Sequence, residues 1–322
     1  MRSAGKQFLG LDKIVSSVRA DLKHGINFEK PPGAYLQTGD KEVNAVLGHQ
    51  ELGIPFGRMI EVSGMESHGK TALAMAIASL AVHTVGAVVT WLDGENSYEE
   101  DWAAKRGLPR ESVALIKPYM GRFKRKKKGV ERNVDMLSSG EVLCNEATKT
   151  VEALANAGHK HIVLVVDSLP SLVPENTLTT GLEHQSMRNN GDLAMLLGKV
   201  LPLWVGLGSA CNLMVLLINQ LRAAPAQHGD PMYQPGGNAL KFYCQVRARV
   251  RKYTKSKGGV LIGKMGVPAG IAGEITCTKN KVGGVEGAKV GYQIWRDGAF
   301  AFKKLKGAKP AGEEEEEGDE EE

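Results

Sequence analysis

The sequence has few cysteines, and their spacing matches neither a metal site nor a disulfide framework. The four are spread widely along the chain, at Cys144, Cys211, Cys244 and Cys277. We therefore expect free thiols, buried in the core of a protein that works in a reducing compartment.

Long apolar runs are also lacking. No stretch approaches the ~20 apolar residues that cross a bilayer. The first residues have no apolar signal core behind them, and no internal repeat is evident. We expect a cytoplasmic protein without membrane contact. The 322 residues, 42% hydrophobic and 24% charged, are typical of a soluble globular protein. They suffice for one large α/β core with a small appendage.

Basic residues are missing from the last ten positions. Residues 313–322 contain nine acids and no base, while the whole chain has a net charge of +5. Removing those nine negative charges leaves the rest of the chain at +14. A body this basic indicates a polyanionic partner. The acidic segment is either a solubility tail or an intramolecular competitor for the basic surface, which would weaken nucleic-acid binding.

One motif is complete. Residues 64–71 read Gly-Met-Glu-Ser-His-Gly-Lys-Thr, a phosphate-binding loop of the form GxxxxGK[ST]. Gly64 and Gly69 allow backbone N–H groups to wrap a phosphate. Lys70 supplies charge for the outer phosphates, and Thr71 offers a hydroxyl to Mg²⁺.

The surrounding pattern predicts an α/β fold. Apolar strands are expected over residues 58–63, 87–92, 161–166 and 212–218, and helices over 72–82, 138–157 and 186–208. Continuous apolar strands alternating with helices indicate a mostly parallel sheet covered on both faces. We expect the shorter runs 245–251, 273–278 and 291–296 to extend this sheet as antiparallel strands.

Three of the predicted strands end in polar residues. Asp167 ends one strand and is a candidate for holding the Mg²⁺ shell. Glu95 follows another and is the candidate base that polarises the attacking water. Gln220, after a third, is placed to sense the γ-phosphate. Because ligands bind at the carboxyl ends of strands in open α/β sheets, we expect these groups to converge on the phosphate loop.

Together with further stretches of the sequence, these residues resemble those of the RecA-type homologous recombinases. The resemblance runs from about residue 40 to residue 302. It rests on residues 58–64, 64–71, 92–95, 165–168, 218–222 and 236–242. It implies a RecA-like P-loop ATPase core that uses ATP and Mg²⁺. Met65 and His68 depart from the family's usual Pro and Ser in the loop, without removing a phosphate-facing glycine.

The resemblance also implies roles for individual residues. Catalytic roles fall on Lys70, Glu95, Gln220, Lys279 and Lys281, where the lysine pair would reach the γ-phosphate of a neighbouring subunit. Nucleotide contacts fall on Gly64, Glu66, Ser67, His68, Gly69, Lys70 and Thr71, with Glu99 and Trp102 near the base. Metal contacts fall on Thr71 and Asp167. DNA contacts fall on Arg222, Gly236, Gly237 and Asn238, in a second DNA loop over residues 219–238. A first DNA loop is expected near residues 176–187.

We divide the chain into three parts. Residues 1–33 hold an amphipathic helix over 6–23, which packs on its own core or docks on a neighbouring subunit. Residues 34–302 form the core, and residues 303–322 a Lys-rich linker with the acidic tail. The small C-terminal domain usual in the family is expected to be missing. Residues 122–132 look inserted, and seven of the eleven are basic; they are either a solvated loop or an auxiliary DNA-contacting patch.

The function that the resemblance implies is a DNA-dependent ATPase. Such a protein forms filaments on single-stranded DNA and exchanges strands with a homologous duplex in recombination and repair. The alternative is a mediator that binds ATP and DNA without strand exchange. A hexameric helicase on the same core is a third reading, but it would not require the stretch 236–242.

Overall fold

The computed structural model describes residues 34–127, 130–180, 191–223, 232–263 and 266–305. The helix predicted over residues 6–23 and the acidic tail lie outside these ranges, as does most of the predicted first DNA loop.

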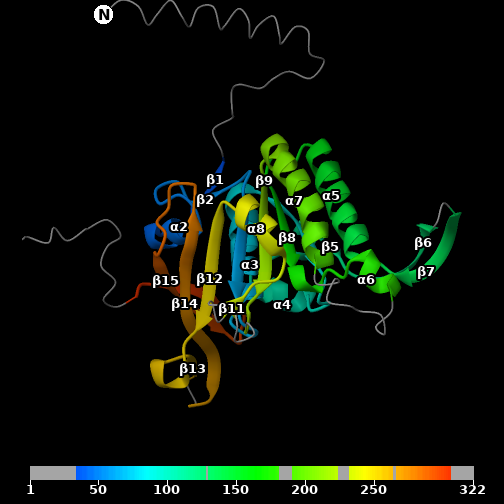
Figure 1. Ribbon diagram of the computed structural model, residues 1–322. Helices are drawn as coiled ribbons and strands as arrows, with labels where there is room; N and C mark the ends of the chain where they lie inside the picture. Colours follow the sequence, from blue (N-terminus) through cyan, green and yellow to red (C-terminus); the bar gives the residue numbers. More distant parts are fainter. Residues whose placement is uncertain (1–33, 128–129, 181–190, 224–231, 264–265, 306–322) are drawn as a thin grey trace, which may run out of the picture. The chain divides into compact units, whose positions relative to one another are not determined.

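A single large sheet organises the core (Figure 1). Its strands, in spatial order, are β16 (Phe300–Lys303), β15 (Lys289–Trp295), β14 (Pro268–Asn280), β12 (Val246–Lys252), β3 (Met59–Gly64), β9 (Leu213–Gln220), β8 (Ile162–Asp167), β4 (Val88–Asp93) and β5 (Val113–Ile116). β13 (Val260–Ile262) pairs with β14 off this path. The pairs from β12 to β5 are parallel, and those from β12 through β14 and β15 to β16 are antiparallel. The predicted mostly parallel sheet with an antiparallel extension is therefore confirmed.

One strand meets its prediction on one side only. The run 245–251 was expected to be antiparallel, and β12 does pair antiparallel with β14, but on its other side it pairs parallel with β3, with Val246 opposite Ile60. The chain reaches β12 through α8 (Gly237–Tyr243), and a helical connection of this kind allows parallel pairing. The short alternating pattern of the segment gave no sign of this crossover. The effect is to place β12 directly beside the strand that enters the phosphate loop.

Helices cover both faces of the sheet, as predicted. On one face α2 (Lys41–Leu47), α3 (Lys70–Val85) and α4 (Glu100–Lys105) pack on a core that includes Val46, Leu73 and Ala103. On the other, α5 (Gly140–Asn156) and α7 (Asp192–Cys211) lie side by side (Figure 1) and bury Leu143 and Leu197. The central strand β8 is buried along its whole length, which explains its continuous apolar sequence.

The local sequence explains where these helices begin and end. Ser139 caps α5 by accepting a hydrogen bond from the Val142 N–H at 3.4 Å, which satisfies a free donor of the first turn. Gly86 ends α3 with φ +64°, a left-handed conformation that glycine adopts without steric cost. A short helix, α6 (Glu175–Thr180), occupies the start of the predicted first DNA loop.

Helix α7 corrects the expectation about apolar runs. It is 20 residues long, and an 18-residue window of it has a mean hydropathy of 1.6, so by length and composition it is apolar enough to cross a membrane. In this fold Leu197, Leu201 and Trp204 on this helix are fully buried against the core. Short polar or glycine residues between the apolar ones hid this helix from a search for uninterrupted runs.

Within the part of the chain that the structure describes, three two-stranded ribbons lie outside the main sheet. They are β1 (Tyr35–Leu36) with β2 (Ile54–Pro55), β6 (Met120–Lys127) with β7 (Val130–Leu137), and β10 (Arg222–Ala223) with β11 (Met232–Tyr233). The reading of residues 122–132 as an open loop is therefore wrong over the described residues, because they belong to the paired strands β6 and β7.

A candidate nucleotide-binding site

The phosphate loop joins the end of β3 to the start of α3. Ser67 and Gly69 adopt φ values of +58° and +88°, which curl the loop. Gly64 allows β12 to approach the loop closely, since a Cβ on Gly64 would lie 2.6 Å from the carbonyl oxygen of Val250 on that strand. A Cβ on Gly69 would lie 2.4 Å from a methyl carbon of Ile294. Both glycines are thus required by the packing of β12 and β15 around the loop.

A cavity of about 500 Å³ opens beside this loop. It is lined by Glu66, Ser67, Gly69, Lys70, Thr71, Ala72, Met75, Glu95, Trp102, Arg106, Asp167, Gln220, Ile271 and Ile294. The fold therefore brings together the phosphate loop and the polar residues predicted at three strand ends. Of the predicted nucleotide-site residues, three do not line the cavity: Gly64, His68 and Glu99.

Thr71 and Asp167 meet inside this cavity. The Thr71 hydroxyl donates to Oδ2 of Asp167 at 2.8 Å. Hard oxygen ligands of this kind suit Mg²⁺, which usually takes one or two protein groups and completes its shell with water and phosphate. Among the described residues there is no cluster of three or more His, Cys, Asp or Glu that would hold a metal alone. The residues present thus fit a metal that arrives with a nucleotide.

Asp167 carries unfavourable electrostatics. Its pKa is raised to about 7, mainly by burial and also by the nearby carboxylates of Glu95 and Asp93, against the lowering effects of the Thr71 hydrogen bond and Lys70. Lys70 is itself buried, and desolvation lowers its pKa, although Asp167 opposes this shift. Its ammonium group donates to the backbone oxygen of Met65 at 2.7 Å. A bound cation and phosphate would relieve both residues at once.

Glu95 lies in the same cavity. Its Oε1 accepts a hydrogen bond from Nε2 of Gln220 at 2.8 Å and another from the hydroxyl of Ser168. Asp93 fixes the turn that contains Glu95 by accepting from the N–H groups of Ser97 and Tyr98, at 3.0 and 2.8 Å. The carboxylate of Glu95 is thus held by two side chains from neighbouring strand ends while its residue stays exposed.

An aromatic residue borders the cavity away from the phosphate loop. Trp102 on α4 faces the guanidinium of Arg106, whose central carbon lies 4.8 Å from the ring centroid. A second cavity of about 330 Å³ continues from there and is also lined by Ile271 and Ile294. The two cavities together offer space for a base beyond the phosphates. Glu99 is exposed at the start of α4.

His68 supports the loop from outside the cavity. Its backbone oxygen accepts a hydrogen bond from the Tyr292 hydroxyl at 2.6 Å, and its Nδ1 lies 3.4 Å from the backbone oxygen of Val250. Burial lowers the pKa of the ring. Met65 is exposed. Neither departure from the expected loop sequence blocks the cavity.

Lys279 and Lys281 do not line this cavity. The Lys279 ammonium group donates to the backbone oxygens of Lys241 and Cys244 at 2.5 and 2.6 Å, and so caps the end of α8. Lys281 is exposed. Within one chain, the lysine pair is therefore separate from the nucleotide site.

The candidate DNA residues surround a short ribbon. Arg222 is exposed and begins β10, which pairs with β11. Gly236 and Gly237 adopt φ values of +107° and +69° and begin α8, where Asn238 is exposed. Residues 224–231, between the paired strands, lie outside the described residues.

A buried polar network beneath this ribbon was not predicted. The carboxylate of Glu61 on β3 accepts from Asn219 at 2.8 Å and from the Arg247 guanidinium. Asn219 also donates to the backbone oxygen of Pro235 at 3.0 Å, and Arg247 to the side chain of Gln234. A charged residue inside an apolar strand was the only signal in the sequence. The network ties three strands to the segment before α8.

Sequence reasoning also missed part of the cavity wall. Ser168 contacts Glu95. The only feature of the sequence that indicated this contact was the position of Ser168 directly after Asp167. Arg106 lies one helical turn after Trp102, a spacing that places the two on one helix face. Ile271 and Ile294 come from the antiparallel strands, which no local pattern assigned to the site.

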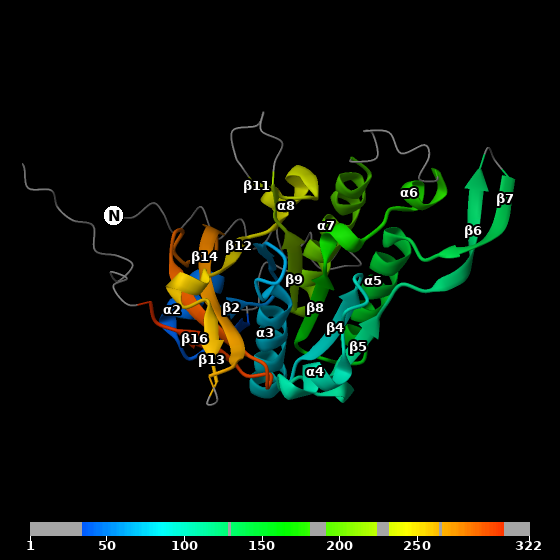
Figure 2. The same ribbon diagram turned by 90° about the horizontal axis from the view of Figure 1, so that it is seen from below.

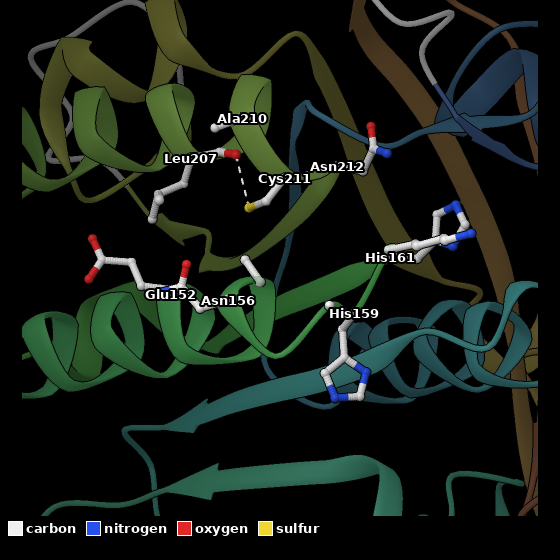
Figure 3. Close-up of a pocket in the computed structure, with 11 residues that line it drawn as sticks. Glu152, Asn156, His159, His161, Leu207, Ala210, Cys211 and Asn212 are labelled. Carbon is white, nitrogen blue, oxygen red and sulfur yellow. Dashed lines mark hydrogen bonds between the residues drawn. The ribbon is translucent and has the colours of Figure 1, made fainter. Parts of the chain in front are cut away.

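Another cavity, of about 750 Å³, lies elsewhere (Figure 3). It opens between the ends of α5 and α7, where β8 and β9 begin, and none of the predicted site residues lines it. Figure 3 shows the rings of His159 and His161 pointing in different directions, with Glu152 on the far side. Its polar groups do not converge on a common point.

Comparisons with known proteins agree with the geometry. The family model described as the RecA N-terminal domain matches residues 30–124 and 120–285. A protein RecA from Geobacter sulfurreducens is 31% identical over 241 residues, which are 74% of this chain and 62% of the relative. One from Chloroherpeton thalassium is 31% identical over 77% of this chain and 59% of its own length. A protein RecA from Geobacter metallireducens is 30% identical over 266 residues, which are 82% of this chain and 67% of the relative. The chain spans about 60% of the length of the first two.

Proposed function

Because this chain belongs to the RecA family, we propose that it is a cytoplasmic DNA-dependent ATPase of recombination and repair. It forms ATP-dependent filaments on single-stranded DNA and exchanges strands with a homologous duplex. The observation that carries the proposal is the hydrogen bond between Gln220 and Glu95. Gln220 ends β9, and the candidate DNA ribbon begins two residues later at Arg222. One residue thus links the candidate catalytic carboxylate to the candidate DNA contact.

Different residues of the cavity contact different parts of ATP. Backbone N–H groups of the phosphate loop and the Lys70 ammonium bind the outer phosphates. To do so, Lys70 gives up its hydrogen bond to the backbone oxygen of Met65. Thr71 and Asp167 hold Mg²⁺, which supplies positive charge against the phosphate oxygens. Glu95 orients and polarises the attacking water. Trp102 packs against the base, and Glu99 lies near it.

Gln220 provides a physical route from DNA to this chemistry. In the described structure its amide occupies Oε1 of Glu95, together with the Ser168 hydroxyl. A carboxylate that accepts two hydrogen bonds is a weaker base for water. DNA held by Arg222, Gly236, Gly237 and Asn238 would draw the end of β9 toward the ribbon and free this oxygen.

The filament would complete the site. Lys279 and Lys281 lie outside the cavity of their own chain, which is consistent with their acting on the nucleotide of a neighbouring subunit. ATP at the boundary between two subunits would then favour assembly, and hydrolysis would weaken it by removing the charge that the lysines contact.

ATP turnover measured with and without single-stranded DNA tests this function. We expect single-stranded DNA to stimulate the native protein. We expect Glu95→Gln to lower stimulated turnover by roughly 10²–10⁴-fold, the usual contribution of a general base, while ATP binding persists. Asp101→Asn, which changes an exposed carboxylate on α4 that does not line the cavity, is the matched control and should keep most of the activity.

Two results would count against the proposal. Full turnover in Glu95→Gln would remove the assigned base. ATP and DNA binding by the native protein without any DNA-stimulated turnover would favour a recombination mediator instead.

A further inference from the structure

Arg106 lies at the boundary between the two cavities beside the phosphate loop. It lines the cavity of about 500 Å³ that contains the loop and also the adjoining cavity of about 330 Å³. Trp102, Ile271 and Ile294 line both cavities as well. Because the loop binds the phosphates at one end of the larger cavity, a bound nucleotide would present its base to this boundary.

The backbone next to Arg106 is held by α3, and its side chain by the turn after β15. Figures 1 and 2 both show α4, which ends directly before Arg106, beside α3. On that side the backbone oxygen of Gly107 accepts hydrogen bonds from Ser79 at 2.8 Å and from Nε2 of His83 at 2.7 Å. On the other side, Nη1 of Arg106 donates to the backbone oxygen of Gly298 at 3.2 Å. The guanidinium is therefore fixed at the boundary before any ligand arrives.

This guanidinium keeps donors that no described residue uses. An arginine side chain has five N–H groups and no acceptor, and Gly298 accepts from one nitrogen, Nη1. The Nε atom is buried and has no hydrogen-bond partner among the described residues. The contact with the Trp102 ring, at 4.8 Å from its centroid, satisfies no N–H group. Since an unpaired buried donor costs free energy, the site favours a ligand that supplies hydrogen-bond acceptors here.

The described residues around this boundary carry positive charge and no negative charge. The smaller cavity is lined by Arg106, Lys252 and Arg296 and, within the described part of the chain, by no acid. The acids that line the larger cavity belong to the phosphate loop and to the strand ends. Glu99 is exposed and lines neither cavity. A base at the boundary would therefore meet N–H donors and no lining carboxylate.

The purine bases differ at the atoms that such donors contact. Guanine presents two neighbouring acceptors, N7 and O6, and an arginine can donate to both at once. Hypoxanthine, the base of ITP, has the same two acceptors. Adenine presents the acceptor N7 beside its N6 amino group, which is a donor like the guanidinium itself. An arginine at this position therefore favours a 6-oxopurine over adenine.

We propose that Arg106 recognises the base by donating to O6 and N7 of a 6-oxopurine, so that the site takes GTP and ITP as well as ATP. Among the described residues, Arg106 is the basic residue that both cavities share, whereas Lys252 and Arg296 line the smaller one alone. This inference rests on the proposed function, to which it adds the class of nucleotide that the site accepts and the residue that determines it.

Competition against a ribose-labelled fluorescent ATP tests this inference, with Mg²⁺, the full chain and no DNA. ATP, GTP and ITP compete in turn for the native protein and two variants of equal charge. Arg106→Met removes the donors but keeps an unbranched side chain against Trp102. Lys105→Met removes an exposed neighbour that lines neither cavity.

We expect Arg106→Met to raise the Kd of GTP and of ITP roughly tenfold relative to that of ATP, because it loses a bidentate contact to the base. Lys105→Met should leave these ratios unchanged. Arg106→Lys keeps the charge without the paired donors, and it should shift the ratios in the same direction. The test therefore does not depend on the folding of one variant.

Two results would overturn the inference. One is a native protein that binds ATP but neither GTP nor ITP. The other is an equal loss for all three nucleotides in both Arg106 variants, as expected of a cation that only packs on Trp102. If single-stranded DNA fails to stimulate ATP turnover while Arg106 still determines the ratios, the proposed function fails and this inference stands.

Discussion

At the scale of single residues, the candidate site is a set of charges that a bound nucleotide and metal would balance. Asp167, Glu95 and Glu66 place three carboxylates around one buried lysine, Lys70. The sequence predicted Asp167 and Glu95 because polar residues at strand ends converge in parallel sheets. It did not predict the contact between Gln220 and Glu95, since side chains from separate strands meet only once the strand order is known.

The raised pKa of Asp167 makes stability depend on pH. The native group has a pKa of about 7 against an ordinary value of 3.8. Between these values the native state holds a proton that the unfolded state has released, so the nucleotide-free protein gains stability as pH falls from about 8 to about 5. The gain is on the order of 2–4 kcal/mol. Urea unfolding should show it in the native protein and in the control Asp101→Asn, and Asp167→Asn should lack it. An equal pH dependence in Asp167→Asn would contradict the assignment.

At the scale of strands and helices, prediction succeeded where the pattern was local. The strand ending at Asp167 and the helix after Thr71 lie within two or three residues of their predicted bounds. Prediction was incomplete for β12, whose parallel pairing with β3 depends on a crossover, and wrong for β6 and β7, whose basic sequence resembled a loop. The structure of β12 and of the β6–β7 ribbon depends on which strands pair with each other. The residues next to each strand in the sequence do not determine this pairing.

The network around Glu61 gives a test at this scale. Arg247→Gln leaves a carboxylate that is 1% exposed without its cation. We expect this to lower the free energy of unfolding by roughly 3 kcal/mol, the usual cost of breaking a buried ion pair. The double variant Glu61→Gln with Arg247→Gln should recover much of the loss, because no unpaired charge remains. Equal stability of the single and double variants in urea unfolding would show that the ion pair is not the cause.

At the scale of the whole molecule, the chain presents parts of two sites. The cavity holds the phosphate loop and Glu95, whereas Lys279 and Lys281 lie apart from it. An interface that joins different surfaces of identical subunits repeats along a helix or a ring. Such an interface would bring the lysines of one subunit to the nucleotide of the next.

Mixing two inactive variants tests this arrangement. Glu95→Gln lacks the base and Lys281→Ala lacks an exposed lysine, so neither should hydrolyse ATP with single-stranded DNA. In an equal mixture, about a quarter of the interfaces pair an intact Glu95 with an intact Lys281. We expect turnover to recover toward that fraction. No recovery, with each variant still folded and bound to DNA, would mean that both residues act within one chain.

The most direct test of the central claim is electron microscopy of the full chain with single-stranded DNA and a non-hydrolysable ATP analogue. We predict helical filaments that require both the analogue and DNA and that fail to form with Lys70→Ala, which lacks the phosphate-binding lysine. Closed rings, or monomers that bind both ligands without assembling, would contradict the account.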